Sequence, residues 1–122
     1  MARYRLSAAA QADIIDILAR TQERFGDTAR HRYEALIVAA IRDIAENPAR
    51  PGAAERPELG AGAQSWHLRH SRERARTAAG TVRRPRHFII FRIHASGTVK
   101  IGRILYDAMD LERHRPTESD WF

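Results

Sequence analysis

Residues 87–106 read HFIIFRIHASGTVKIGRILY, and this stretch decides the fold class that the sequence predicts. Its first part, His87 to Ile93, is a nearly continuous run of β-forming apolar residues, which is typical of a central strand buried on both faces. Ala95-Ser96-Gly97 predicts a tight turn. Apolar residues then alternate from Thr98 to Tyr106, which predicts a neighbouring strand and places a sheet at the centre of the fold.

Two amphipathic helices are predicted before this sheet. Ser7 is a good cap for the first helix, because its hydroxyl can accept a free backbone N–H, and the helical pattern ends at Gly26. The second helix begins at Asp27 or Thr28 and runs to about Glu46, where Asn47-Pro48 stops it. With only two or three residues between them, the helices should form an antiparallel hairpin whose apolar stripes both face the sheet.

The remaining segments complete an α+β pattern. Residues 3–6 and 66–69 alternate as short strands would, and Asp107 should cap a short helical turn over residues 108–113. The sequence thus predicts one domain over residues 1–122: an N-terminal strand and an antiparallel helical hairpin packed on a largely antiparallel four-stranded sheet, in the order β-α-α-β-β-β, with a short C-terminal helical turn. A Pro- and Gly-containing loop (48–65), a basic insertion (71–85) and a tail (116–122) connect and end these elements.

Composition excludes several classes of protein. The chain of 122 residues has no cysteine, which excludes disulfides and thiolate metal sites. No apolar run has the length of a membrane span, and the first residues do not resemble a signal peptide, so we expect a cytoplasmic protein without a membrane partner.

The positive charge is concentrated in one part of the chain. The net charge is +6, and residues 64–106 carry ten basic groups against one acidic group, whereas residues 1–63 are balanced and residues 107–122 are acidic. Such asymmetry predicts an acidic partner: a nucleic acid, an acidic protein surface or an acidic antitoxin segment. The alternative for the arginines of residues 69–92 is a solvated, flexible loop.

Three strings carry a resemblance to a known family. They are Tyr4-Arg5-Leu6-Ser7 with the helix behind it, Arg32-Tyr33 through Ile44 to Asn47-Pro48, and, most specifically, Gly102-Arg103-Ile104-Leu105-Tyr106-Asp107-Ala108-Met109-Asp110-Leu111-Glu112-Arg113-His114. Over residues 3–115 the chain resembles the ParE branch of the RelE/ParE toxins of bacterial type II toxin–antitoxin systems. Two departures bear on its target: a longer segment between Trp66 and Phe88, and Tyr106 where the family commonly has histidine.

The resemblance implies a toxin that poisons DNA gyrase by protein–protein contact, without catalysis, and that a cognate antitoxin neutralises in a hetero-oligomer. RelE-like relatives instead cut messenger RNA on the ribosome, which is the alternative function, and a toxin fold without toxicity is the third. A ribonuclease would draw on Arg69, Arg92, Arg103, Tyr106 and His114. Arginine is a poor general base, and Arg103 and Tyr106 should face opposite sides of their strand, so the ribonuclease is the less favoured function.

No cofactor or metal is expected, because His67 and His70 should face opposite sides of a strand and no ligand motif occurs. Arg92 and Arg103 interrupt apolar strands, so each should reach an open sheet face or pair with a carboxylate, for which Asp110 is a candidate. Met109 and Leu111 are expected under the sheet or against a partner, and Trp121 and Phe122 folded back or docked on a second chain. The candidates for target binding are Arg69, Arg83, Arg84, Arg86, Arg92, Arg103, Met109 and Arg113. Those for antitoxin binding are Leu18, Tyr33, Leu36, Ile37, Trp121 and Phe122.

Overall fold

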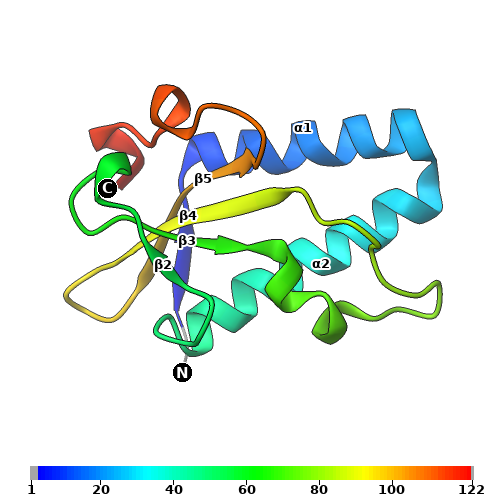
Figure 1. Cartoon of the computed structure of the whole chain (residues 1–122), viewed down its shortest axis with the longest axis horizontal. Coiled ribbons are helices and arrows are strands. Elements are labelled where there is room, and N and C mark those ends of the chain that lie inside the picture. The colour runs from blue at the N-terminus through cyan, green and yellow to red at the C-terminus, as the bar shows by residue number, and fades with distance from the viewer. Residues whose placement is uncertain (1–2, 122) are drawn as a thin grey trace.

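Two antiparallel helices cover one face of a five-stranded sheet (Figure 1). The computed structural model describes residues 3–121. The helices are α1 (Ala8–Phe25) and α2 (Asp27–Glu46), and the strands are β1 (Tyr4–Leu6), β2 (Ala54–Glu55), β3 (Gln64–His67), β4 (His87–Ile93) and β5 (Val99–Tyr106). The strand order is β1-β5-β4-β3-β2, with β1 parallel to β5 and every other pair antiparallel. The predicted α+β class and element order are confirmed, although the sheet has five strands where four were expected.

The helical hairpin forms where the sequence predicted it. The Ser7 hydroxyl accepts the Ala10 N–H at 2.9 Å and so caps α1. Gly26 alone separates the helices, and its φ of 92° is a conformation that glycine adopts without strain. The Gly26 N–H donates to the Gln22 carbonyl at 2.8 Å, which closes the last turn of α1.

Apolar side chains fill both faces of β4, as expected for a central strand. Ile89 and Phe91 lie in the core between the sheet and the helices, together with Leu36 from α2. Ile90 points to the other face, where the C-terminal segment covers it with Trp121. The chain after β5 therefore forms a second layer beyond the sheet (Figure 1).

The loop predicted over residues 48–65 contains the unexpected strand. The two residues of β2 pair with β3, Ala54 opposite Ser65, and a 3-10 turn, Pro57–Leu59, follows them. The strand predicted at residues 66–69 begins and ends two residues earlier. It ends because the His67 ring accepts the Arg69 N–H at 3.1 Å and starts a 3-10 turn at residues 68–71.

The C-terminal expectation was wrong in one detail. Asp107 caps no helical turn, since a 3-10 turn forms later, over Leu111–His114, and the Asp107 carboxylate binds other side chains. Neither α1 nor α2, the long helices of the part described, is apolar enough to cross a bilayer.

Candidate functional site

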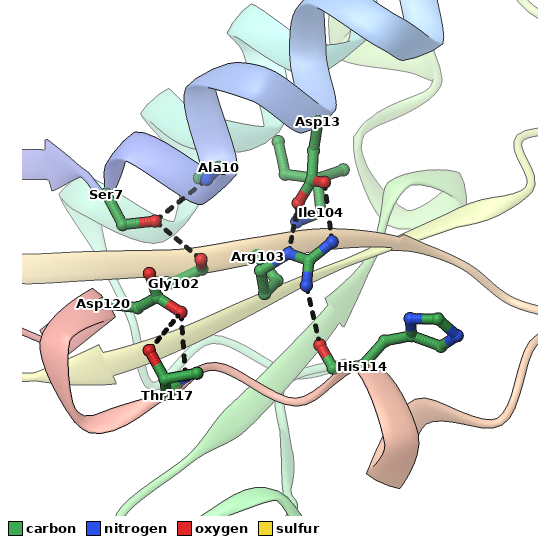
Figure 2. Close-up of polar contacts among 9 residues, drawn as sticks. All are labelled: Ser7, Ala10, Asp13, Gly102, Arg103, Ile104, His114, Thr117 and Asp120. Atoms are coloured by element: carbon green, nitrogen blue, oxygen red, sulfur yellow. Dashed lines mark hydrogen bonds and ion pairs between the residues drawn. The ribbon is translucent and has the colours of Figure 1, made fainter.

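Side chains of α1 close the open edge of β5. Strand β1 is only three residues long and pairs with β5 as far as Ile101. Beyond it, the Ser7 hydroxyl donates to the Gly102 carbonyl at 2.7 Å, and the Asp13 carboxylate accepts the Ile104 N–H at 2.9 Å (Figure 2). Backbone groups that would otherwise lack partners are thereby satisfied by α1.

The same carboxylate binds Arg103. Nε and Nη2 of Arg103 contact the two oxygens of Asp13 at 2.7 and 2.9 Å, and Nη1 donates to the His114 carbonyl at 3.1 Å (Figure 2). The hydrogen bond to Asp13 raises the pKa of Arg103. Asp110, the partner suggested from sequence, is therefore the wrong carboxylate. Arg103 joins α1, β5 and the C-terminal segment, and all three directions of its guanidinium are engaged.

Arg92 and the end of the chain meet on the sheet face away from the helices. The Arg92 guanidinium carbon lies 5.2 Å from the centre of the Trp121 ring, and the Lys100 ammonium donates to the Trp121 carbonyl at 2.8 Å. Trp121 folds back and is only 5% exposed. Met109 and Leu111 are half-buried against the same cluster, which agrees with their expected packing under the sheet.

A polar cluster, which we call the histidine cluster (Tyr33, His67, Arg86, His87 and Asp107), lies at the end of the sheet where β3 and β5 end and β4 begins. The His67 ring accepts the Arg69 N–H on Nδ1, so Nε2 carries the hydrogen and donates it to Asp107 at 2.9 Å. Arg86 binds the other Asp107 oxygen through Nε at 2.9 Å and Nη2 at 2.8 Å. Burial raises the pKa of Asp107, but the bonds from Arg86 and His67 outweigh it, and the net effect lowers this pKa.

The other two members of the histidine cluster, Tyr33 and His87, are uncharged at neutral pH. The backbone N–H of Arg86 donates to the Tyr33 hydroxyl at 3.2 Å, and the same hydroxyl shares a hydrogen bond of 2.5 Å with His87 Nδ1. Burial lowers the pKa of His87 to about 4 and raises the pKa of Tyr33 to about 12. Tyr106, 39% exposed, covers the cluster, with its ring 5.7 Å from that of His87 and 5.0 Å from the Arg86 guanidinium carbon.

Four exposed arginines lie within three residues of a histidine-cluster residue in the chain or belong to the cluster, and we call them the arginine rim (Arg69, Arg83, Arg84 and Arg86). Arg69 follows β3 directly and Arg86 precedes β4, so both leave the sheet at the same end. Arg86 is bound to Asp107. The side chains of the other three form no hydrogen bond, ion pair or ring contact with any residue between 3 and 121.

The basic insertion that carries part of the rim has a defined structure. Buried Asp43 of α2 accepts the Ser71 hydroxyl at 2.6 Å and Nε of Arg74 at 2.7 Å. Farther along, Arg72 Nε donates to the Val82 carbonyl at 2.6 Å and closes the loop just before the rim. The arginines at 83 and 84 thus project from a pinned segment.

The five residues proposed for a ribonuclease are not brought together. Tyr106 pairs with His87 and Arg92 with Lys100, at opposite ends of the β4–β5 pair. Arg103 is held by Asp13, Arg69 belongs to the rim, and His114 lies in the 3-10 turn with its carbonyl bound to Arg103. The described residues that do gather at the end of the sheet, His67, His87 and Asp107, were not predicted as a site.

The sequence model of one family, described as ParE toxin of type II toxin-antitoxin system, parDE, matches residues 4–111. The chain belongs to the ParE toxin family. The match includes both helices, every strand and the arginine rim. A search among curated proteins finds no similar sequence.

A ParE toxin implies a cognate antitoxin as partner, and the residues predicted to bind it are placed as follows. Leu18, Leu36, Ile37 and Tyr33 lie in the core beneath the helices, Trp121 is buried, and Phe122 is outside the described residues. Their antitoxin contacts stay a prediction. The large apolar side chains that α1 and α2 do expose are Ile15, Phe25 and Val38.

The target-binding candidates of this ParE family member divide into two groups. Arg92, Arg103 and Met109 make internal contacts. Arg113 is exposed in the 3-10 turn, and Arg69, Arg83, Arg84 and Arg86 are exposed on the rim, where Arg86 is also bound to Asp107. Within residues 3–121, no group of three histidine, aspartate or glutamate side chains could hold a metal ion.

Proposed function

We propose that this ParE-family toxin inhibits DNA gyrase in the bacterial cytoplasm by direct contact, and that its antitoxin relieves the inhibition within a hetero-oligomer. The observation that carries the proposal is the arginine rim of a ParE-family chain, where three guanidinium groups have no partner among the described residues. Two of them, Arg83 and Arg84, project from a pinned segment, and Arg69 projects from the turn after β3. A backbone segment held in place before binding loses less conformational entropy on association, which favours recognition of a macromolecule.

The chemistry of the histidine cluster supports a binder over an enzyme. A general base works best with a pKa near the operating pH, whereas burial holds His87 near 4. Asp107 has both oxygens engaged by His67 and Arg86, and arginine does not give up its proton at neutral pH. The alternative of a ribosome-dependent ribonuclease therefore needs a base that this surface does not offer in its present arrangement.

The test is a supercoiling and cleavage assay with purified gyrase, DNA and toxin. We expect supercoiling to stop and cleaved DNA to accumulate, and addition of the antitoxin to reverse both effects. The variant R69Q/R83Q/R84Q should require at least about tenfold more toxin, because each exposed charge-assisted contact contributes on the order of 1 kcal/mol. R5Q, which removes an exposed arginine from β1 at the other side of the sheet, is the matched control and should leave the toxin unchanged.

Expression in cells separates the alternatives. A gyrase poison should induce the DNA-damage response and filamentation, whereas a ribonuclease should halt translation within minutes. Cleavage of messenger RNA in a purified translation system, together with unaffected gyrase, would refute the proposal. Normal growth without the antitoxin would favour a fold that has lost its toxicity.

A further inference from the structure

We propose that the arginine rim binds the sugar–phosphate backbone of duplex DNA. Binding by the isolated chain is a property of the rim itself. The further step, that the DNA is the segment held by gyrase, rests on the proposed function. The rim would then contact the nucleic acid of the enzyme–DNA complex, and other parts of the toxin would contact the protein.

The charge around the rim is positive without local compensation. Glu73, the acidic residue nearest in sequence to Arg69, Arg83 and Arg84, is paired with Arg72 and Arg76. Asp107, which binds the fourth rim arginine, Arg86, is also paired with His67. Three guanidinium groups therefore remain without a counter-charge from the described chain. Arginine forms charge-assisted hydrogen bonds with phosphates, and release of the counterions condensed on the nucleic acid supplies affinity that an acidic protein surface does not offer to the same extent.

An apolar anchor for a protein partner is absent from the described surface beside the rim. Stable protein interfaces depend on a few buried aromatic or aliphatic side chains at their centre. Among residues 3–121, the large apolar side chains that are exposed are Tyr4, Ile15, Phe25, Val38, Ile93 and Tyr106. Only Tyr106 contacts a rim arginine, and the others lie on β1, on the helices or at the far end of β4. A surface of charge with one aromatic ring suits a phosphate backbone better than an acidic protein.

The presence of a single exposed aromatic side chain at the described rim, Tyr106, favours a duplex over a single strand as the ligand. Proteins that hold single-stranded nucleic acid stack successive bases on several aromatic side chains. Here Tyr106 is the one exposed aromatic at the rim, and the Arg86 guanidinium already lies over it at 5.0 Å. Backbone contacts, which need no base stacking, remain as the mode of binding.

The experiment measures binding of the purified toxin to a short random-sequence duplex by fluorescence anisotropy, as a function of salt. Three phosphate contacts predict a slope of log K against log salt of about −2.7, so affinity should fall about 40-fold between roughly 50 and 200 mM salt. Each of R69Q, R83Q and R84Q should reduce the slope by about 0.9. R5Q carries the same change of charge and should leave the slope unaltered. Because counterion release depends on the charge of the side chain, R83K/R84K should retain affinity within about threefold.

Four results would overturn the inference. They are an absence of binding at low salt, a triple variant R69Q/R83Q/R84Q that binds as wild type, an equal loss in R5Q, and tighter binding to single-stranded RNA or to an acidic peptide than to the duplex. The gyrase assay is scored separately. Gyrase inhibition by a toxin without affinity for DNA would refute the inference and leave the proposed function standing. DNA binding without gyrase inhibition would refute the proposed function and leave DNA binding by the rim standing.

Discussion

Acidification should destabilise the folded chain through His87, well before its carboxylates are protonated. The His87 ring, at the start of β4, is hydrogen-bonded to the Tyr33 hydroxyl of α2 through Nδ1 and is half-buried, and burial lowers its pKa to about 4 from the usual 6.5. In the unfolded chain this histidine takes up a proton as the pH falls below 6.5, whereas in the folded chain it stays neutral. The unfolded state is thus stabilised relative to the folded state.

The two pKa values set the size and range of the effect. The difference between 6.5 and about 4 corresponds to a loss of at most roughly 3 kcal/mol in the free energy of unfolding. The stability of the folded state that depends on neutral His87 is fully present above pH 6.5 and declines below it. It is lost by about pH 4, where His87 of the folded state also binds the proton. Asp107 acts in a lower range, because its pKa is depressed below 3.8 and its stabilisation disappears only as the pH falls through that depressed value.

Urea unfolding followed by tryptophan fluorescence, at several values between about pH 7.5 and 4.5, measures this dependence. The wild-type chain should lose most of the stated free energy over that range. H87Q, whose side-chain oxygen can still accept the Tyr33 hydroxyl but does not titrate, should lose about 2 to 3 kcal/mol less. His70, whose pKa is lowered by burial and by Arg69, contributes in the same direction and remains in both proteins. Exposed His94 provides the control H94Q, and equal slopes in H87Q and wild type would refute the reasoning.

Three further predictions concern the junction between α1 and β5, and each is measured by urea unfolding. D13A should lower the free energy of unfolding by about 3 to 5 kcal/mol, because it leaves the Arg103 guanidinium without its carboxylate and the Ile104 N–H without an acceptor. Addition of R103M should recover part of that loss, and additive losses in the double variant would contradict the pairing. G102A should cost about 1 to 3 kcal/mol, because its new methyl group would lie 2.8 Å from Cγ of Pro116, and an unchanged midpoint would show that the C-terminal segment is not packed there. S7A should cost about 1 to 2 kcal/mol through loss of the cap and of the bond to the Gly102 carbonyl, whereas S7T should be nearly neutral, and equal losses would count against the hydroxyl's role.

The parts of the fold that the sequence predicted depend on local signals. Ser7, Gly26 and Pro48 act within a few residues of the helix ends that they mark, and the apolar run of β4 requires burial on both faces wherever it is placed. Strand β2 has no such signal. Its two residues, Ala54 and Glu55, are extended because β3 offers an open edge, and that edge exists only after the sheet has formed.

The histidine cluster could not be predicted for the same reason. His67 and Asp107 lie 40 residues apart, and their meeting follows from the antiparallel order of β3, β4 and β5. The sequence showed that a charge within the apolar strand β5 needs a partner. It did not show that Asp13, 90 residues before Arg103, would reach it across the open edge of that strand in place of the candidate Asp110.

The arginines of residues 64–106 divide into those with internal partners and those without. Within a strand, an unpaired charge is too costly to bury, so Arg92 rests on the Trp121 ring and Arg103 is bound by Asp13. Outside the strands no such cost applies. Four arginines there bind carboxylates, namely Arg72, Arg74, Arg76 and Arg86, whereas Arg69, Arg83 and Arg84 form no ion pair with the described residues. The ten basic groups of this segment therefore overstate the charge available to a target. Any affinity that the toxin draws from arginine should depend on these three rim residues far more than on net charge, and substitutions within β4 and β5 should act through stability instead.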